Sequence, residues 1–180
     1  RYTGGLTNNV SYKGFDFTLF FYFQEGNKIM NMNDFFLVHG GTQNNIGFVP
    51  RQLERWQRKG DVTDIPRLTT STLNPSANNS AANNYGGNVA NLSSRYLEDG
   101  SFIRLRTLSL AYTLPPSLIK RFRLSNVRTY VQGTNLLTFT RYGGPDPEVN
   151  SQSANQNTTG YDWATVPQAK TIQVGINLVF

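Results

Sequence analysis

The segment Thr171-Ile-Gln-Val-Gly-Ile-Asn-Leu-Val-Phe180 alternates between large apolar and small or polar side chains. Successive side chains of a β-strand point to opposite faces of the sheet. The apolar face of this strand would carry Ile172, Val174, Ile176, Leu178 and Phe180. A transmembrane β-barrel strand needs about 9–11 residues, apolar toward lipid and polar toward the lumen. The segment therefore predicts the closing strand of an outer-membrane β-barrel, which it fits better than a strand of a soluble sandwich.

The segment from Phe15 to Phe23 shows the same alternation with larger side chains. One face carries Phe15, Phe17, Leu19, Phe21 and Phe23, and the other carries Asp16, Thr18, Phe20 and Tyr22. Lys13-Gly14 has the composition of a two-residue hairpin turn, so residues 2–12 and 15–25 are expected to pair as antiparallel strands. An apolar face of this size suits lipid, and the alternative is the core of a soluble sandwich.

Residues 101–114 and 126–140 are the next two predicted strands. In the first, Arg104 and Arg106 have the same parity as the apolar residues that follow them. Charges on that face are tolerable only beyond the hydrocarbon or past a β-bulge. In the second, two consecutive leucines break the alternation and leave the lipid-facing side undetermined. With a closing strand at about 169–180, the chain is predicted to be all-β, with about five antiparallel strands of a large transmembrane barrel.

The connections between the predicted strands alternate between short and long. Long loops are predicted at about 26–95 and 141–167, with a short helix over 50–60 and one helical turn over 117–122. Barrels have short periplasmic turns and long extracellular loops, so the long loops would be extracellular and the C-terminus periplasmic. Five strands with two free edges cannot close a barrel, so we expect a C-terminal segment of a longer protein.

The composition excludes several classes of site. The 180 residues include no cysteine and a single histidine, His39, so neither thiolate nor multi-histidine metal sites can form within this chain. The mean hydropathy is −0.43, which a barrel permits because only half of its strand residues face lipid. The net charge of +6 is scattered and lacks interleaved aromatic residues, so nucleic acid is not an expected partner.

Several motifs resemble the SusC/RagA family of TonB-linked outer-membrane proteins of Bacteroidetes. They are Asp99-Gly-Ser-Phe-Ile-Arg-Leu-Arg-Thr-Leu-Ser-Leu-Ala-Tyr-Thr-Leu-Pro115, Asn126-Val-Arg-Thr-Tyr-Val-Gln-Gly-Thr-Asn-Leu-Leu-Thr-Phe-Thr140 and Tyr142-Gly-Gly-Pro-Asp-Pro-Glu148. Trp56 with Gly60-Asp-Val-Thr-Asp-Ile-Pro-Arg67 and the segment Pro167-Gln-Ala-Lys-Thr171 are similar to the family as well. Each motif is modest alone, and their order and spacing make the resemblance specific.

The resemblance implies a TonB-dependent transporter that imports oligosaccharides or peptides across the outer membrane. It implies a TonB complex, engaged through an N-terminal region that these residues do not contain, and a SusD-like surface lipoprotein as partners. It implies neither a cofactor nor an enzymatic activity. By the same resemblance, Phe180 with Leu178 and Ile176 forms the signal that the outer-membrane assembly machinery reads.

Candidate contact residues lie in the predicted loops. Asp61 would touch a polar ligand, and an Asx turn is the alternative. Asp146 and Glu148 form a pair of carboxylates, for which hydrolysis or calcium coordination are alternatives to a place in a transporter loop. Aromatic side chains would stack on a sugar or contact the lipoprotein, with packing between loops as the alternative. These are Trp56, Tyr85, Tyr142 and Trp163.

Two competing functions remain open at this point. A soluble all-β carbohydrate-binding module would bury the face of Phe15–Phe23 in a sandwich core. A porin or adhesin without a plug would use the same barrel strands without coupling to TonB. Detergent dependence separates the first from a transporter, and an upstream plug domain separates the second.

Overall fold

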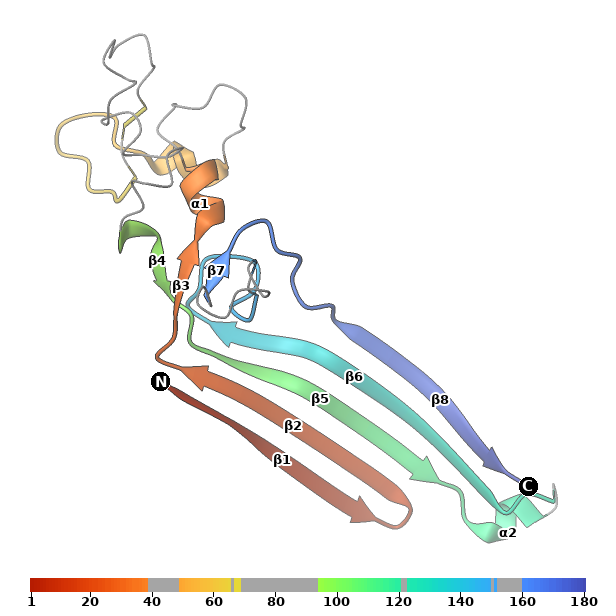
Figure 1. Cartoon of the computed structure of the whole chain (residues 1–180). Helices are drawn as coiled ribbons and strands as arrows, with labels where there is room; N and C mark the ends of the chain where they lie inside the picture. The colour runs from red at the N-terminus through yellow and green to blue at the C-terminus, as the bar shows by residue number, and fades with distance from the viewer. Residues whose placement is uncertain (39–48, 66, 69–93, 121–122, 150, 152–159) are drawn as a thin grey trace.

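The computed structural model describes residues 1–38, 49–65, 67–68, 94–120, 123–149, 151 and 160–180. They form a five-stranded antiparallel sheet with a three-stranded sheet at one end (Figure 1). The order in the large sheet is β1-β2-β5-β6-β8. Its strands are β1 (Tyr2–Tyr12), β2 (Phe15–Glu25), β5 (Phe102–Thr113), β6 (Asn126–Thr140) and β8 (Thr171–Val179). Each strand ends within two residues of the predicted bounds.

The hairpin between β1 and β2 has the predicted two-residue turn. Lys13 and Gly14 have φ values of 45° and 85°, as a type I′ turn requires. A Cβ at Gly14 would lie 2.8 Å from the carbonyl oxygen of Thr113, so the neighbouring strand also demands glycine here. This turn, α2 (Pro116–Ile119) and the C-terminus lie at the end of the large sheet opposite the small sheet (Figure 1).

The two faces of the large sheet differ in chemistry along every strand. Residues directly opposite each other in antiparallel strands share a face. One row on the first face, which we name the apolar face, is Val10, Phe17, Leu110, Val131 and Val174, all exposed. The adjacent row on the other face, which we name the polar face, is Asn9, Thr18, Ser109, Gln132 and Gln173. In these rows the large exposed apolar side chains lie on one face, and Val179 at the end of β8 is an exposed apolar residue on the other face.

A β-bulge in β5 resolves the position of its two arginines. Phe20 pairs with Thr107 and Phe21 pairs with Leu105, so Arg106 is an extra residue on β5. Beyond this point the parity of β5 reverses, and Arg104 lies on the polar face. Of the two explanations that the sequence left open, the structure shows the bulge.

β6 keeps a single parity in spite of its two consecutive leucines. Odd-numbered residues, among them Val131 and Phe139, lie on the apolar face at both ends of the strand. At the register shift Asn135 has a φ of 53°, and the side chain of Leu136 lies 2.6 Å from where a Cβ of Gly133 would be. The missing side chain of Gly133 therefore makes room for Leu136.

The first predicted loop, 26–95, contains more structure than expected. It holds β3 (Lys28–Asn31), α1 (Met32–Leu37) and the 3-10 helices η1 (Pro50–Glu54) and η5 (Ser94–Tyr96), which leads into β4 (Leu97–Asp99). The helix predicted over 50–60 is wrong beyond Glu54. There the backbone becomes extended, with a ψ of 156° at Arg55, and the N–H of Trp56 donates to the carbonyl of Ile65 at 2.8 Å.

The second predicted loop, 141–167, also contributes a strand to the small sheet. β7 (Tyr161–Asp162) pairs in parallel with β3, which gives the order β4-β3-β7. Met32, Phe35 and Tyr96 are buried together above this sheet, with Phe36 and Tyr161 packed against them. The described residues thus place a compact apolar core in the loop region, at one end of the large sheet. No helix among them is long and apolar enough to cross a membrane.

Candidate functional site

Two arginines of β5 meet two carboxylates of the loop that follows β6. The Nη2 atom of Arg104 lies 2.5 Å from Oδ1 of Asp146, and its Nη1 lies 3.2 Å from Oε2 of Glu148. Arg106, the bulged residue, pairs with Oε1 of Glu148. The side chains of Arg104 and Asp146 are 1% and 5% exposed, so this pair is nearly excluded from water. We name these four residues the charge cluster.

Asp146 is the centre of the charge cluster. Besides Arg104, its carboxylate accepts from the N–H groups of Glu148 and Gln168, each at 2.9 Å. Burial opposes the charged form, but the hydrogen bonds from Arg104, Glu148 and Gln168 outweigh it and hold the pKa of Asp146 below its usual range. The carboxylate of Asp146 therefore connects β5, the loop that follows β6 and the segment that leads into β8.

Tyr142 fastens the same loop to the small sheet. Its hydroxyl donates to Oδ2 of Asp162 at 2.7 Å, and both side chains are buried. Burial, followed by this hydrogen bond and the negative charge of Asp162, raises the pKa of Tyr142 far above its usual value. The N–H of Gly143 donates to Glu98 at 2.7 Å, and Glu98 in turn accepts from the side-chain amide of Asn31. The segment 142–148 is thus held at both ends.

Two other predicted contact residues, Trp56 and Asp61, form no hydrogen bond or ion pair with the charge cluster within the described part of the chain. Trp56 is half-buried, and Asp61 accepts from the N–H groups of Gln57 and Arg58, each at 2.9 Å. These bonds lower the pKa of Asp61. They come from residues that precede Asp61, so they are not the Asx turn, in which the carboxylate accepts from the N–H two residues further along. Tyr85 lies outside the described residues.

Trp163 presents an exposed aromatic surface beside the small sheet. Its side chain is 51% exposed, and its ring stacks on Phe36 with centroids 5.0 Å apart and an interplanar angle of 23°. The following residue, Ala164, has a φ of 51°, and its N–H donates to Oδ1 of Asn33 at 2.8 Å. The backbone at Trp163 is therefore fixed, and the indole remains accessible.

Sequence reasoning missed two features of this region, the pairing within the charge cluster and the partner of Tyr142. Arg104 and Arg106 were recognised as misplaced charges and Asp146 with Glu148 as a carboxylate pair, but the two observations were not joined. The signal that could have joined them is that two arginines within a predicted barrel strand require counter-charges. Asp162, which is fully buried, lies within the loop predicted over 141–167, and the sequence around it carries no such signal.

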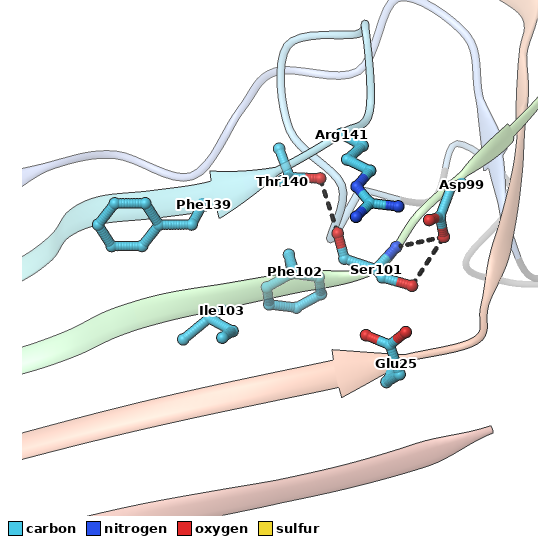
Figure 2. A pocket seen from close by; sticks show the side chains of 8 residues that line it. All are labelled: Glu25, Asp99, Ser101, Phe102, Ile103, Phe139, Thr140 and Arg141. Carbon is cyan, nitrogen blue, oxygen red and sulfur yellow. Dashed lines mark hydrogen bonds between the residues drawn. The ribbon is translucent and has the colours of Figure 1, made fainter.

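A pocket of about 310 Å³ lies where β2, β5 and β6 reach the loops (Figure 2). Ile103 and Phe139 of the apolar face line it together with Glu25, Asp99 and Arg141. Ser101 donates through both its N–H and its hydroxyl to Oδ1 of Asp99, and these bonds lower the pKa of Asp99.

The terminal strand places its predicted signal residues on the apolar face. Ile176 and Leu178 pair with Thr129 and Val127, and Phe180 follows on the same parity with 87% of its surface exposed. Across the described part of the chain, no group of three side chains suited to hold a metal ion comes together.

Comparison with known proteins decides what kind of sheet this is. No family model matches the chain. It is 35% identical over 183 residues to TonB-dependent receptor P3 of Formosa agariphila, and 30% identical over 179 residues to TonB-dependent receptor P26 of the same organism. These matches cover 99% and 98% of the chain and 16% of each relative.

Solved structures agree with these relatives. The RagAB peptide importer in the open-open state matches 99% of the chain at a TM-score of 0.75 and 28% identity. In the closed-closed state it matches 98% of the chain at a TM-score of 0.73 and 27% identity. The chain belongs to the SusC/RagA-type TonB-dependent receptors. The predicted family and the predicted fold class are confirmed. The five strands are a segment of an outer-membrane β-barrel, and the chain covers 17% of the matched RagAB chain.

The barrel assigns an environment to each face of this receptor segment. The apolar face contacts lipid, and the polar face lines the lumen. The charge cluster therefore lies on the lumen side, where Asp146 and Glu148 neutralise arginines that could not face hydrocarbon.

Proposed function

We propose that this chain forms part of the wall and surface loops of a TonB-dependent transporter that imports oligosaccharides or peptides. The transporter would work with a SusD-like surface lipoprotein, and the TonB complex would energise it through a region of the full-length protein. The observation that carries the proposal is the match to the RagAB peptide importer over 99% of the chain at a TM-score of 0.75. The segregated apolar and polar faces of the sheet support the same proposal.

The proposed orientation places the loops outside the cell and the C-terminus in the periplasm. The small sheet and α1 lie at one end of the barrel strands, and the hairpin turn and Phe180 lie at the other (Figure 1). Barrels of this kind have short periplasmic turns and longer extracellular loops. Phe180 would then be available to the assembly machinery, together with Leu178 and Ile176.

Within this transporter the charge cluster would keep the segment 142–148 fixed against the lumen wall. The chain matches the RagAB importer about equally well in its open-open and closed-closed states, with TM-scores of 0.75 and 0.73. These similar scores are consistent with barrel strands and a segment 142–148 that keep the same shape in both states. The exposed ring of Trp163, and with it Trp56, Asp61 and Tyr85, would contact ligand or lipoprotein at the extracellular mouth.

The test is uptake by the source organism with the full-length receptor gene deleted and restored. We expect the deletion to abolish growth on one defined oligosaccharide or peptide mixture, and removal of TonB to have the same effect. Uptake that persists without TonB would favour a porin, and surface adhesion without uptake would favour an adhesin. Recovery of the receptor in the soluble fraction would favour the carbohydrate-binding module.

A further inference from the structure

The apolar face ends abruptly at the loop end of the sheet. Its last apolar row is Phe23, Ile103 and Phe139, exposed by 39%, 51% and 60%. Two residues beyond this row lie Glu25 at the end of β2, Ser101 just before β5 and Arg141 just after β6, and all three line the pocket. The side chain of Arg141 and that of Glu25 lie on either side of Ser101 at the pocket shown in Figure 2. The boundary between hydrocarbon and headgroup therefore crosses this pocket.

The polar part of this pocket stands on a fixed frame. The hydroxyl of Ser101 accepts from the N–H of Gly26 at 3.0 Å and donates to Oδ1 of Asp99 at 2.7 Å. It ties the end of β2 to the start of β5. The carboxylate of Asp99 is thereby held in place through one oxygen, and its other oxygen has no hydrogen-bond partner among the described residues.

Two charged groups beside that frame, Glu25 and Arg141, make no direct polar contact within the described ranges. Both side chains are exposed. Lys28 lies opposite Asp99 in the β3–β4 register, and its positive charge acts on that carboxylate although Lys28 does not line the pocket. Two carboxylates and two cations leave the rim electrically balanced, so an anionic group can approach Arg141 without net repulsion.

We propose that this pocket binds the headgroup of a phosphorylated glycolipid of the surrounding leaflet. The guanidinium of Arg141 would hold the phosphate in a bidentate contact, the geometry that suits arginine. Glu25 and the free oxygen of Asp99 would accept hydroxyl donors of the sugar. Ile103 and Phe139 would contact the first methylenes of the acyl chains. The pocket opens on the lipid side of the barrel, so this lipid is not the transported substrate.

The inference depends on the orientation given under the proposed function, and the test separates the two. The full-length receptor is purified from outer membranes in detergent and titrated with lipid A while native mass spectrometry counts the bound lipid. We expect Arg141→Gln to weaken lipid A binding about tenfold or more, because a charge-assisted contact is lost. Arg141→Lys should restore part of it. The matched control is Lys120→Gln, which removes one positive charge at the opposite end of the wall.

Several outcomes would overturn the inference. They are equal binding of lipid A and its dephosphorylated form, wild-type affinity in Arg141→Gln, or a loss in Lys120→Gln as large as in Arg141→Gln. Heat-modifiable mobility in gels checks that each variant is a folded barrel. A receptor that transports normally but binds no lipid A would refute the lipid site and leave the proposed function intact. A receptor absent from the outer membrane would refute the proposed function first.

Discussion

Replacing Asp146 with asparagine would leave the guanidinium of Arg104 buried beside a neutral amide. The two side chains are 1% and 5% exposed, and the atoms that pair are 2.5 Å apart. Breaking a buried ion pair by removing one partner costs about 3–5 kcal/mol. Glu148 remains 3.2 Å from Arg104 and compensates in part, so we expect the lower end, about 3 kcal/mol.

The loss should appear as local opening of the segment 142–148. Hydrogen exchange in the full-length receptor can follow the amides of Glu148 and Gln168, which both donate to Asp146. About 3 kcal/mol corresponds to exchange faster by roughly a hundredfold. Arg104→Met tests the same clamp without removing the acceptor of these amides, and it should accelerate their exchange as well. The amide of Met30, which donates to Gly160, is the control and should not change.

The double variant and the pH dependence provide the refutation. If the pair is coupled, Arg104→Met together with Asp146→Asn costs clearly less than the sum of the single changes. The pKa of Asp146 is lowered in the folded receptor, so its stabilisation is present above the unfolded pKa of about 3.9 and is lost as pH falls through the folded value. Protection of both amides should therefore be equal at pH 7 and pH 5. Additive costs, or loss of protection already at pH 5, would refute this reasoning.

Three further predictions concern other parts of the receptor. Val174→Arg places a charge on the lipid side and should cost about 2–4 kcal/mol in urea titration of the folded barrel, whereas Gln173→Arg on the lumen side should cost little. Deleting Phe180 should lower insertion into the outer membrane, and unchanged heat-modifiable mobility with normal surface exposure of the loops would contradict this. Tyr142→Phe removes the hydrogen-bond donor to the buried Asp162 and should lower the local stability of the loop by about 1–3 kcal/mol. Faster cleavage of the loop by protease would measure this loss.

The barrel strands could be predicted because their pattern is local. Phe15–Phe23 and the last ten residues each show the period of two over enough positions to define both faces. The two arginines of β5 were also informative, because charges with lipid-facing parity required either a β-bulge or a position beyond the hydrocarbon layer. What decided between these was the pairing of β5 with β2, which no single strand reveals.

The loop region could not be predicted because its contacts join distant parts of the chain. α1 has six residues and β7 has two, too few for any period to appear. Phe35 packs on Tyr96 with ring centroids 5.2 Å apart, and Arg104 pairs with Asp146 across 42 residues. The predicted helix over 50–60 failed for the same reason, since the carbonyl of Ile65 draws the backbone at Trp56 out of the helix.

The receptor segment divides its apolar side chains between two surroundings, and the charge cluster lies where the two meet. Val174 is 78% exposed in the chain and needs lipid, whereas Met32 is fully buried and needs only the loop core. Val131, the partner of Val174, lies seven residues along β6 from the partner of Arg104, a distance of about 20 Å. The changes in stability caused by two substitutions that far apart, with no shared partners, are usually additive. We therefore expect Val174→Arg and Asp146→Asn to lower stability independently, the first in barrel unfolding and the second in loop exchange, and a coupling above about 0.5 kcal/mol would show that wall and loops unfold as one unit.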